Sequence, residues 1–547
     1  MKKLTIPVML IVLCGALVSK AQDYYWVAFS NKNNSPWLLS EPEKFLSERS
    51  IQRRIKQNIQ VDSLDLPVNP SYISQVLDLG AEFIHSSKWL NGITVKATSE
   101  SFFSEVKQLP FVSEAKLSKR SFGIKSAVVK FQEPETSINI NNNFIHNYGE
   151  SSYQLIQINA QFFHEQNFRG QGMQIAVLDA GFFNVDKYPA FDSLWMNRQI
   201  LGTKNFVDDS NVFDSHSHGM SVLSTMGGNV PGMLIGTAPK ASYWLIITEE
   251  NKSEFAIEED NWVAGAEFAD SAGVDIINSS LGYFTFDDPA MDYSYEDMNG
   301  STTRVTKGAN IAASRGMLVF SSAGNEGNKE WKYIIAPSDG DSVIGVGAVN
   351  SDGRPAAFTS FGPAAGGKIK PNVSATGWNT IIVRPNGEVA TGSGTSYSSP
   401  VLAGAAACLW QANPHASAHH VKQAIEQSAH LFDKPDSLVG YGIPDLKTAD
   451  LILKNIFVNK QKNRNTWQVY PNPAKDYIVL QKNEKVTSSK VQIGFYSTDG
   501  RLLHKEETKD AVKILLQNLQ TLPPGIVILQ IVTENSTDAL KIGINFN

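Results

Sequence analysis

Ser396 lies where a small, hydroxyl-rich turn leads into an apolar helix, within residues 394–404. A serine just inside a helix N-terminus lies beside backbone N–H groups that the helix leaves unpaired, and these would stabilise an anion developing nearby. That position suits a nucleophile. It equally suits a helix cap, because Ser and Thr cap helices in proteins of every kind. The choice depends on whether a base, an orienting carboxylate and an oxyanion donor occur elsewhere.

Three other residues supply those groups. Asp179 directly follows an apolar run, His218 precedes a small-residue helix, and Asn325 comes just after another apolar run. With Ser396 they form a complete set of nucleophile, base, orienting group and oxyanion donor. Taken singly, Asp179 is an ordinary strand-end carboxylate and Asn325 an ordinary turn residue beside glycine. Only jointly do the four residues indicate catalysis.

The histidines allow a second interpretation. His216 and His218 form a His-x-His pair that could ligate a metal, and His419 and His420 add two more imidazoles. No carboxylate or cysteine accompanies them at ligand spacing, so we predict no metal site and no required cofactor, and we interpret His216 as a loop residue.

The elements that position these residues alternate between short apolar runs and helical patterns. We predict strands at 174–178, 242–247, 274–278, 317–321 and 342–347, and helices at 261–272, 303–315, 395–411 and 418–430. Runs that are apolar on both faces are typical of a parallel sheet covered by helices. In such sheets, sites gather at the carboxyl ends of the strands, which is where the candidate residues occur.

Composition limits the class of protein. The chain has 547 residues, of which 42% are hydrophobic and 19% charged, so a globular protein of several domains is expected. Its 48 Lys and Arg against 54 Asp and Glu give a net charge of −6. This balance is too mild to steer the protein to nucleic acid or to an anionic membrane.

Residues 1–21 have the pattern of a secretory signal peptide. Lys2 and Lys3 precede an apolar run over 4–18, and small residues follow at Ser19 and Ala21. Removing this segment leaves Cys408 as the single cysteine, so no internal disulfide is expected. No second apolar run reaches the roughly 20 residues of a membrane helix, so we predict no membrane span in the mature protein.

Residues 22–130 read as a small α+β module, followed by a polar linker and processing region at 131–152. Strand patterns occur at 24–29, 81–84 and 92–97, and a basic helix-like segment occupies 43–57. This module could be a binding domain, but its place between a signal peptide and an enzyme-like region suggests a pro-segment.

Several motifs resemble the subtilisin-like serine proteases in content and order. They lie at 175–181, 218–219, 278–282, 323–325 and 394–404, and they span nearly all of a domain at 153–455. The resemblance implies an α/β fold of three layers with a mostly parallel central sheet.

The resemblance also implies roles. Ser396 would attack the scissile carbonyl, His218 would transfer its proton, Asp179 would hold the imidazole, and Asn325 would donate to the oxyanion. Substrate backbone would pair with a second set: Ser280, Leu281, Gly282, Ala323 and Gly324. Ile335 would lie at the base of the pocket, and we expect an apolar or small side chain before the cut, because no acidic residue is clearly placed to select Lys or Arg.

Some positions depart from the family pattern. Ala180 replaces the usual Thr or Ser, Met220 the usual Thr, and Tyr397 the usual Met beside the nucleophile, where it would narrow the leaving-group side. Structural calcium is compatible with the family but cannot be assigned, since Tyr188 stands where the tight site's aspartate ligand is expected.

The family also gives the first module a role. Residues 22–130 fit its inhibitory, folding-assisting propeptide, with cleavage expected between Ser118 and Ser151. The product would be a zymogen whose partners are polypeptide substrates and its own propeptide.

After a linker at 456–466, residues 467–547 show short alternating strands that predict a small β-sandwich. The opening motif at 470–473 and the closing Lys541-Ile542 resemble the sorting domain of Bacteroidetes proteins exported by the type IX system. An ordinary carbohydrate- or protein-binding β module is the alternative. The sorting interpretation implies the secretion machinery as a partner, and a secreted or cell-surface location reached through the periplasm and outer membrane.

The predicted function is therefore a secreted serine endopeptidase that works through an acyl-enzyme. The alternative is a catalytically inactive relative, in which the same fold binds peptides without cutting them.

Overall fold

The computed structural model describes residues 22–121, 147–464, 467–482, 490–498, 500–533 and 537–545. The chain divides into two compact units after Leu453, and each unit is considered by itself. The predicted signal peptide, 1–21, and residues 131–146 of the predicted processing region lie outside the described residues. No helix in the described part of the chain has the length and apolar character needed to cross a membrane.

The first domain is an antiparallel sheet with two helices packed on it, which confirms the predicted α+β module. Its strand order is β2-β3-β1-β4. The strands are β1 (Tyr24–Phe29), β2 (Ala81–Ser87), β3 (Gly92–Ala97) and β4 (Val112–Lys119), and the helices are α1 (Glu48–Gln57), α2 (Pro70–Leu77) and α3 (Phe102–Val106). Buried residues of the strands, such as Val27 and Val95, pack against Val76 of α2 and Phe102 of α3.

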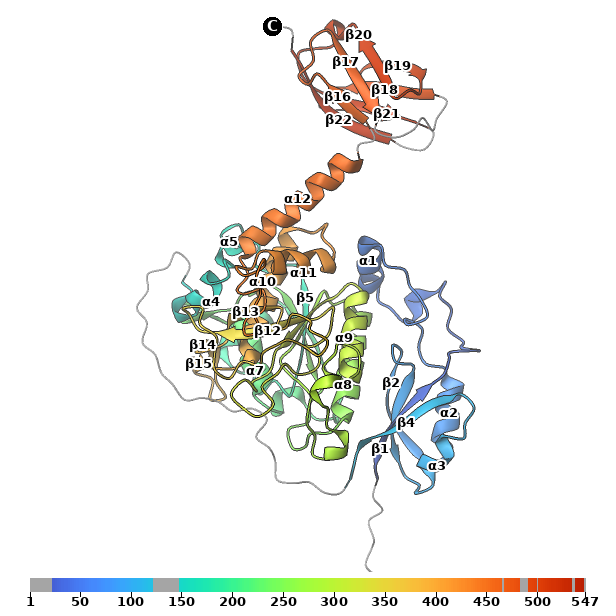
Figure 1. Cartoon of the computed structure of the whole chain (residues 1–547), viewed down its shortest axis with the longest axis vertical. Coiled ribbons are helices and arrows are strands. Elements are labelled where there is room, and N and C mark those ends of the chain that lie inside the picture. Colours follow the sequence, from blue (N-terminus) through green and yellow to red (C-terminus); the bar gives the residue numbers. More distant parts are fainter. Residues whose placement is uncertain are drawn as a thin grey trace, which may run out of the picture. The chain divides into compact units, whose positions relative to one another are not determined.

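A seven-stranded sheet, parallel throughout, forms the centre of the same unit (Figure 1). In spatial order its strands are β13 (Val373–Thr376), β12 (Ile344–Val349), β11 (Leu318–Ser322), β10 (Ile276–Ser279), β5 (Gln174–Asp179), β9 (Ser242–Ile247) and β6 (Ile200–Asn205). The predicted parallel sheet is thus confirmed, and its neighbouring strands bring the candidate residues to one edge.

Helices cover the sheet. Alternate residues of β5, Ala176 and Leu178, belong to a core with α8 (Ile257–Ala272) and α9 (Arg304–Ser314). The long helix α10 (Thr395–Ala412) contacts β10 to β13 and also α7 (His218–Gly227). These two helix layers and the sheet between them give the expected three-layer fold.

Shorter elements complete this unit. They are α4 (Ser152–Ile156), α5 (Gln161–Glu165), α6 (Asp192–Met196), α11 (Ala418–Gln427), and the hairpins β7–β8 (Asn229–Val230, Leu234–Ile235) and β14–β15 (Thr380–Val383, Val389–Gly392). Helix α12 (Leu446–Arg464) differs from the prediction, since it runs through most of the linker expected at 456–466. No Gly or Pro interrupts 446–464, so nothing in that stretch stops a helix.

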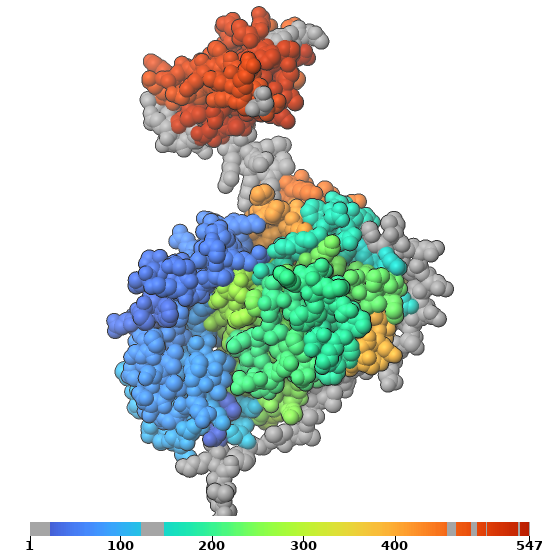
Figure 2. Space-filling view, turned by 180° about the vertical axis from the view of Figure 1, so that it is seen from behind, coloured from blue at the N-terminus to red at the C-terminus, as the bar shows by residue number. Residues whose placement is uncertain are grey.

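The first domain packs along α8 (Figure 2). Near the C-terminal end of α8, Glu267 accepts hydrogen bonds from the backbone N–H groups of Lys88 (2.8 Å) and Trp89 (3.0 Å). One turn further along, Arg53 and Arg54 of α1 reach the buried carboxylate of Asp270. The basic helix predicted from the sequence is therefore part of an interface.

The C-terminal unit consists of two antiparallel sheets around one core, which confirms the predicted small β-sandwich. One sheet contains β16 (Trp467–Tyr470), β17 (Tyr477–Lys482) and β20 (Lys513–Gln517). The other contains β19 (Leu502–Lys509), β18 (Lys490–Tyr496), β21 (Gly525–Val532) and β22 (Thr537–Ile544).

Candidate active site

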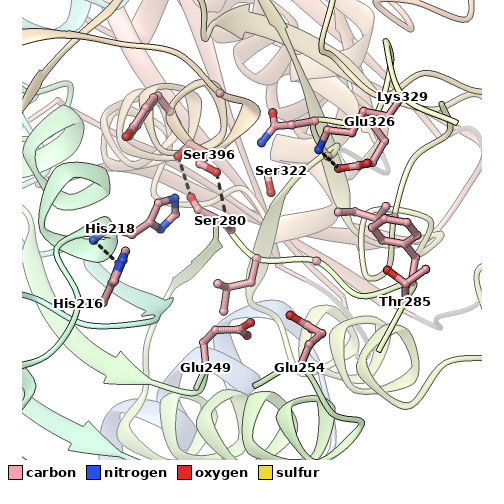
Figure 3. A pocket seen from close by; sticks show the side chains of 18 of the residues that line it. His216, His218, Glu249, Glu254, Ser280, Thr285, Ser322, Glu326, Lys329 and Ser396 are labelled. Atoms are coloured by element: carbon pink, nitrogen blue, oxygen red, sulfur yellow. Dashed lines mark hydrogen bonds and ion pairs between the residues drawn. The ribbon is translucent and has the colours of Figure 1, made fainter. Parts of the chain in front are cut away.

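The four candidate residues come from four different elements of the central domain. Asp179 is the last residue of β5, His218 the first of α7, Ser396 the second of α10, and Asn325 follows β11. His218, Asn325 and Ser396 line one pocket of about 520 Å³ (Figure 3). Asp179 is completely buried behind His218. The fold therefore brings together residues that are up to 217 positions apart.

Asp179 and His218 are directly paired. His218 Nδ1 lies 2.7 Å from Asp179 Oδ1, which also accepts a hydrogen bond from the backbone N–H of Ala180 at 2.8 Å. This contact fixes the ring so that Nε2 is the other nitrogen available for chemistry. The glycine after the histidine is required, because a Cβ at Gly219 would lie 2.5 Å from Gly181 O.

His216 supports this arrangement from a loop, as predicted. Its Nδ1 accepts a hydrogen bond of 3.1 Å from the backbone N–H of His218. Burial, with the nearby His218, lowers the pKa of His216, which favours its neutral form.

Ser396 is not the capping residue of its helix. The N-cap of α10 is Gly394, so the cap interpretation of Ser396 is wrong. The Ser396 hydroxyl donates a long hydrogen bond of 3.4 Å to Ser280 O, and Ser280 Oγ donates to Ser396 O at 2.8 Å. Ser399 Oγ also donates to Asn278 Oδ1 at 2.9 Å. These contacts hold the start of α10 against the end of β10.

Asn325 has a fixed amide orientation. Its Oδ1 accepts hydrogen bonds from the backbone N–H (2.9 Å) and the hydroxyl (3.0 Å) of Thr395. A backbone N–H can only donate, so the atom facing Thr395 must be the oxygen, and Nδ2 points away from it. The preceding Gly324 has φ +110°, and a Cβ there would lie 2.7 Å from Ser360 Oγ, so glycine is needed to present Asn325.

Four of the five predicted substrate-binding residues line the pocket: Ser280, Leu281, Gly282 and Gly324. Ala323 is fully buried and is not part of the lining. Ile335 does line the pocket, and its Cδ1 would be 2.2 Å from a Cβ at Gly282. Ile335 thus fills the space beside these glycines, as expected for a residue at the pocket base.

The motifs did not identify the acidic residues of the pocket. Its lining also contains the carboxylates Glu249, Glu254, Asp287 and Glu326. Glu249 Oε2 accepts a hydrogen bond of 2.9 Å from the buried hydroxyl of Tyr283, and burial, with the nearby carboxylates, raises the pKa of that tyrosine. The first three residues lie in loops that carry no family motif, and only the fold brings them to the pocket.

The departures from the family pattern have structural consequences. The Tyr397 ring lies 6.3 Å from the His218 ring and lines the pocket, consistent with a narrowed leaving-group side. The Tyr188 hydroxyl donates to Pro385 O at 2.7 Å. A neutral phenol engaged in this way does not supply the carboxylate expected at this position, so the family's tight calcium site is not assigned to these residues.

Comparison with known proteins agrees with this architecture. Residues 170–442 match the subtilase family, 24–133 match the peptidase S8 propeptide domain of Bacteroidota, and 468–545 match a secretion system C-terminal sorting domain. The alternative of a binding module is therefore wrong for both flanking domains, and the sorting domain implies secretion.

Curated relatives are bacterial proteases. Subtilisin E of Bacillus subtilis (strain 168) is 30% identical over 305 residues, which cover 54% of this chain and 71% of the relative. Subtilisin of Bacillus pumilus is 30% identical over 283 residues, covering 51% of this chain and 90% of the relative. The thermostable alkaline protease of Halalkalibacterium halodurans is 28% identical over 289 residues, covering 52% and 70%. The chain belongs to the subtilase family of serine proteases.

Proposed function

We propose that this subtilase is an endopeptidase in which Ser396 is the nucleophile, His218 the general base and acid, and Asp179 the group that orients the imidazole. The observation that carries the proposal is the 2.7 Å contact between His218 Nδ1 and Asp179 Oδ1, with His218 in the same pocket as Ser396. Serine is a poor nucleophile until its proton is removed as the new bond forms, and a neutral imidazole does this near physiological pH.

The reaction would begin with a rotation of the Ser396 side chain. Its hydroxyl, directed at Ser280 O in this structure, turns to His218 Nε2 when substrate binds. Attack on the scissile carbonyl gives a tetrahedral oxyanion, and collapse of that intermediate, with His218 donating its proton to the leaving amine, gives the acyl-enzyme. Water then attacks the acyl-enzyme with His218 as the base, and collapse of the second tetrahedral intermediate releases the second product and restores Ser396.

The oxyanion would be held by two donors. One is the backbone N–H of Ser396 in the first turn of α10, and the other is Nδ2 of Asn325. The two hydrogen bonds from Thr395 hold the Asn325 amide before substrate arrives, so no reorganisation is needed when charge develops.

The substrate would be an extended polypeptide that pairs with Ser280, Leu281 and Gly282 like an added strand, with Gly324 on the opposite wall. Ile335 leaves little depth below Gly282, which favours a small or apolar side chain before the cut.

The two flanking domains support the proposal that this endopeptidase is made as a secreted zymogen. Residues 22–130 would assist folding and inhibit the catalytic domain at 153–455 until cleavage within or near 131–152. The domain at 467–547 would direct export through the type IX system, across the periplasm and outer membrane, to the cell surface or the medium. The proposed ranges 153–455 and 467–547 extend beyond the family matches at 170–442 and 468–545, whereas 22–130 ends three residues before the match at 24–133.

A covalent probe separates this function from an inactive, peptide-binding relative. The processed protein is treated with a fluorophosphonate, and the adduct is located by mass spectrometry. We expect one adduct, on Ser396, absent from Ser396→Ala and retained in Ser399→Ala, whose hydroxyl is bonded to Asn278. A correctly folded, processed wild type that takes no label would favour the peptide-binding alternative.

A further inference from the structure

Three carboxylates form one side of the substrate pocket. We name Glu249, Glu254 and Asp287 the acidic wall; all three line the pocket. Figure 3 shows the side chains of Glu249 and Glu254 directed toward one another on the same side of the pocket. The loop of Asp287 is joined to that of Glu254 by two hydrogen bonds: Asp287 N–H donates to Glu254 O at 2.8 Å, and Glu254 N–H donates to Asp287 Oδ2 at 3.2 Å. The wall is therefore built across two loops that hold each other in place.

Acidic groups are concentrated at the wall. Glu258 lies beneath it, and carboxylate oxygens of Glu249, Glu254 and Glu258 all lie within 4.8 Å of one another. Of the described lining residues only one is a lysine, Lys329, and it pairs with Glu326 at 3.0 Å. Like charges at this spacing repel, so a cationic group entering the pocket would relieve the repulsion.

Two basic residues of the chain's own propeptide pair with carboxylates that directly follow wall residues in the sequence. Strand β4 ends at Lys119, whose Nζ pairs with Glu250, the neighbour of Glu249. The next residue, Arg120, has Nε 2.6 Å from Asp288 Oδ2, and Asp288 is the neighbour of Asp287. Two consecutive basic residues thus pair with the carboxylates next to Glu249 and Asp287, one in each of the two loops.

The wall lies on the acyl side of the bond to be cut. Ser396 Oγ is 3.4 Å from Ser280 O, so the scissile carbonyl would lie near Ser280. The segment from Ser280 leads away from this point through Gly282 to Asp287, lining the pocket along the way. In Figure 3, His218, which must reach the leaving amine, lies to the left of Ser396 and Ser280, whereas Glu249 and Glu254 lie below them. Substrate residues before the cleaved bond therefore run toward the wall.

We propose that the acidic wall selects polypeptides with a Lys or Arg side chain a few residues before the cleaved bond. This inference rests on the proposed endopeptidase function and names its substrate class. The basic side chain is recognised upstream, whereas the residue next to the cut faces Ile335 and stays small. Charged groups in the wall strengthen the binding of a cation mainly because the pocket is partly closed to water.

The test uses processed wild-type enzyme and quenched fluorescent peptides with alanine before the cleavable bond. Within a matched pair, the peptides differ only at one upstream position, which holds Lys or Gln, and the position is moved along the peptide. We expect kcat/KM to be about tenfold or more higher for Lys than for Gln at one or two upstream positions at low salt. This ratio should fall toward one in Glu254→Gln and invert, to favour Gln over Lys, in Glu254→Lys.

A matched control and a metal test complete the design. Glu330→Gln removes an exposed carboxylate that is not part of the pocket lining, and it should keep the wild-type ratio.

Equal kcat/KM for Lys and Gln at every upstream position would overturn the proposal and leave the endopeptidase function intact, since both peptides would still be cut. A Lys preference seen only after chelation and abolished by added Ca²⁺ would also overturn it, because the wall would then be a metal site. Failure to cut any peptide or to take the covalent probe would instead contradict the proposed function.

Discussion

Arg54 and Asp270 form an ion pair that is completely buried between the propeptide domain and helix α8, with Nη2 and Oδ2 2.9 Å apart. Arg54 also forms an ion pair with Asp65, and Asp270 forms further ion pairs with Arg53 and Lys88. These cations lower the pKa of Asp270 against the effect of burial, so the carboxylate is ionised in the interface. The propeptide domain is thus held by charges at a site distant in sequence from the pocket.

Arg54→Ala should loosen this interface strongly. Removal of Arg54 takes one cation from each of the buried carboxylates Asp65 and Asp270. Because other cations remain beside both, the loss should lie toward the lower end of the roughly 3–5 kcal/mol that breaking a buried ion pair costs. Hydrogen exchange of the α1 amides in an unprocessed Ser396→Ala background measures the local opening free energy. Lys44→Ala, which removes an exposed pair with Glu41, is the control and should leave the exchange unchanged. A loss below about 1 kcal/mol for Arg54→Ala would mean that packing, not charge, holds the domain.

Acid should weaken the same interface through His85. This residue is buried against α8, its Nε2 is 2.8 Å from Asn261 Oδ1, and burial lowers its pKa from 6.5 to about 4. The separated domain therefore binds more protons than the assembled one between pH 6.5 and about 4. Above pH 6.5 the neutral His85 ring contributes up to about 3 kcal/mol to the stability of the interface. This contribution is lost as the pH falls from 6.5 to about 4.

The contribution of His85 is isolated by comparison with His85→Gln, whose amide can still donate to Asn261. Burial raises the pKa of Asp260 and Glu267 on the same helix, which acts in the opposite direction on acidification, so only the difference between the two proteins is informative. We expect the opening free energy of the interface in wild type to fall more steeply than in His85→Gln between pH 6.5 and 4. Parallel curves would exclude His85 as the cause.

Ala180→Ser should stabilise the catalytic domain. Asp179 Oδ2 is buried, and within the described residues it has no hydrogen-bond partner, while position 180 lacks the hydroxyl usual in the family. A hydroxyl donor there would satisfy a charged acceptor, worth about 1 kcal/mol or slightly more. Thermal unfolding should show a raised Tm. An unchanged or lower Tm would indicate that the new hydroxyl does not reach Oδ2.

Much of the fold and site could be predicted from local pattern. The apolar run that ends at Asp179 and the run before Asn325 each had one consistent interpretation as buried parallel strands, and this fixed where their polar residues would meet. The family motifs then supplied the order of the elements. The local sequence pattern also predicted helix α1, but the only further property it indicated was that this helix is basic.

The remaining features depend on contacts between distant parts of the chain. From the sequence alone, Arg54 is expected at the surface. Only the fold brings Asp270, 216 positions later, beside it. Glu254 and Asp287 lie in loops with no periodic pattern, and they reach the pocket because β9 and β10 end at the same edge of the sheet. The sequence does not distinguish a polar linker from the helix that runs through 456–464, because the same polar residues are tolerated in both.

Asn325→Leu should depress turnover rather than substrate binding. The amide donor is needed only when the oxyanion forms, so its loss costs about 2.7–4 kcal/mol of transition-state stabilisation, or roughly 10²–10³ in kcat. KM should change little. Kinetics on a small peptide substrate separate the two effects, and an unchanged kcat would remove Asn325 from the oxyanion site.

Steady-state peptide hydrolysis by Ser396→Ala tests the central claim most directly. The variant is matured in trans by wild-type enzyme, which is then removed, so that both proteins are compared in processed form. If Ser396 is the nucleophile, kcat falls by about 10⁶, the size of loss that follows removal of the serine from such a triad. Turnover by the pure, folded variant within tenfold of wild type would contradict the account.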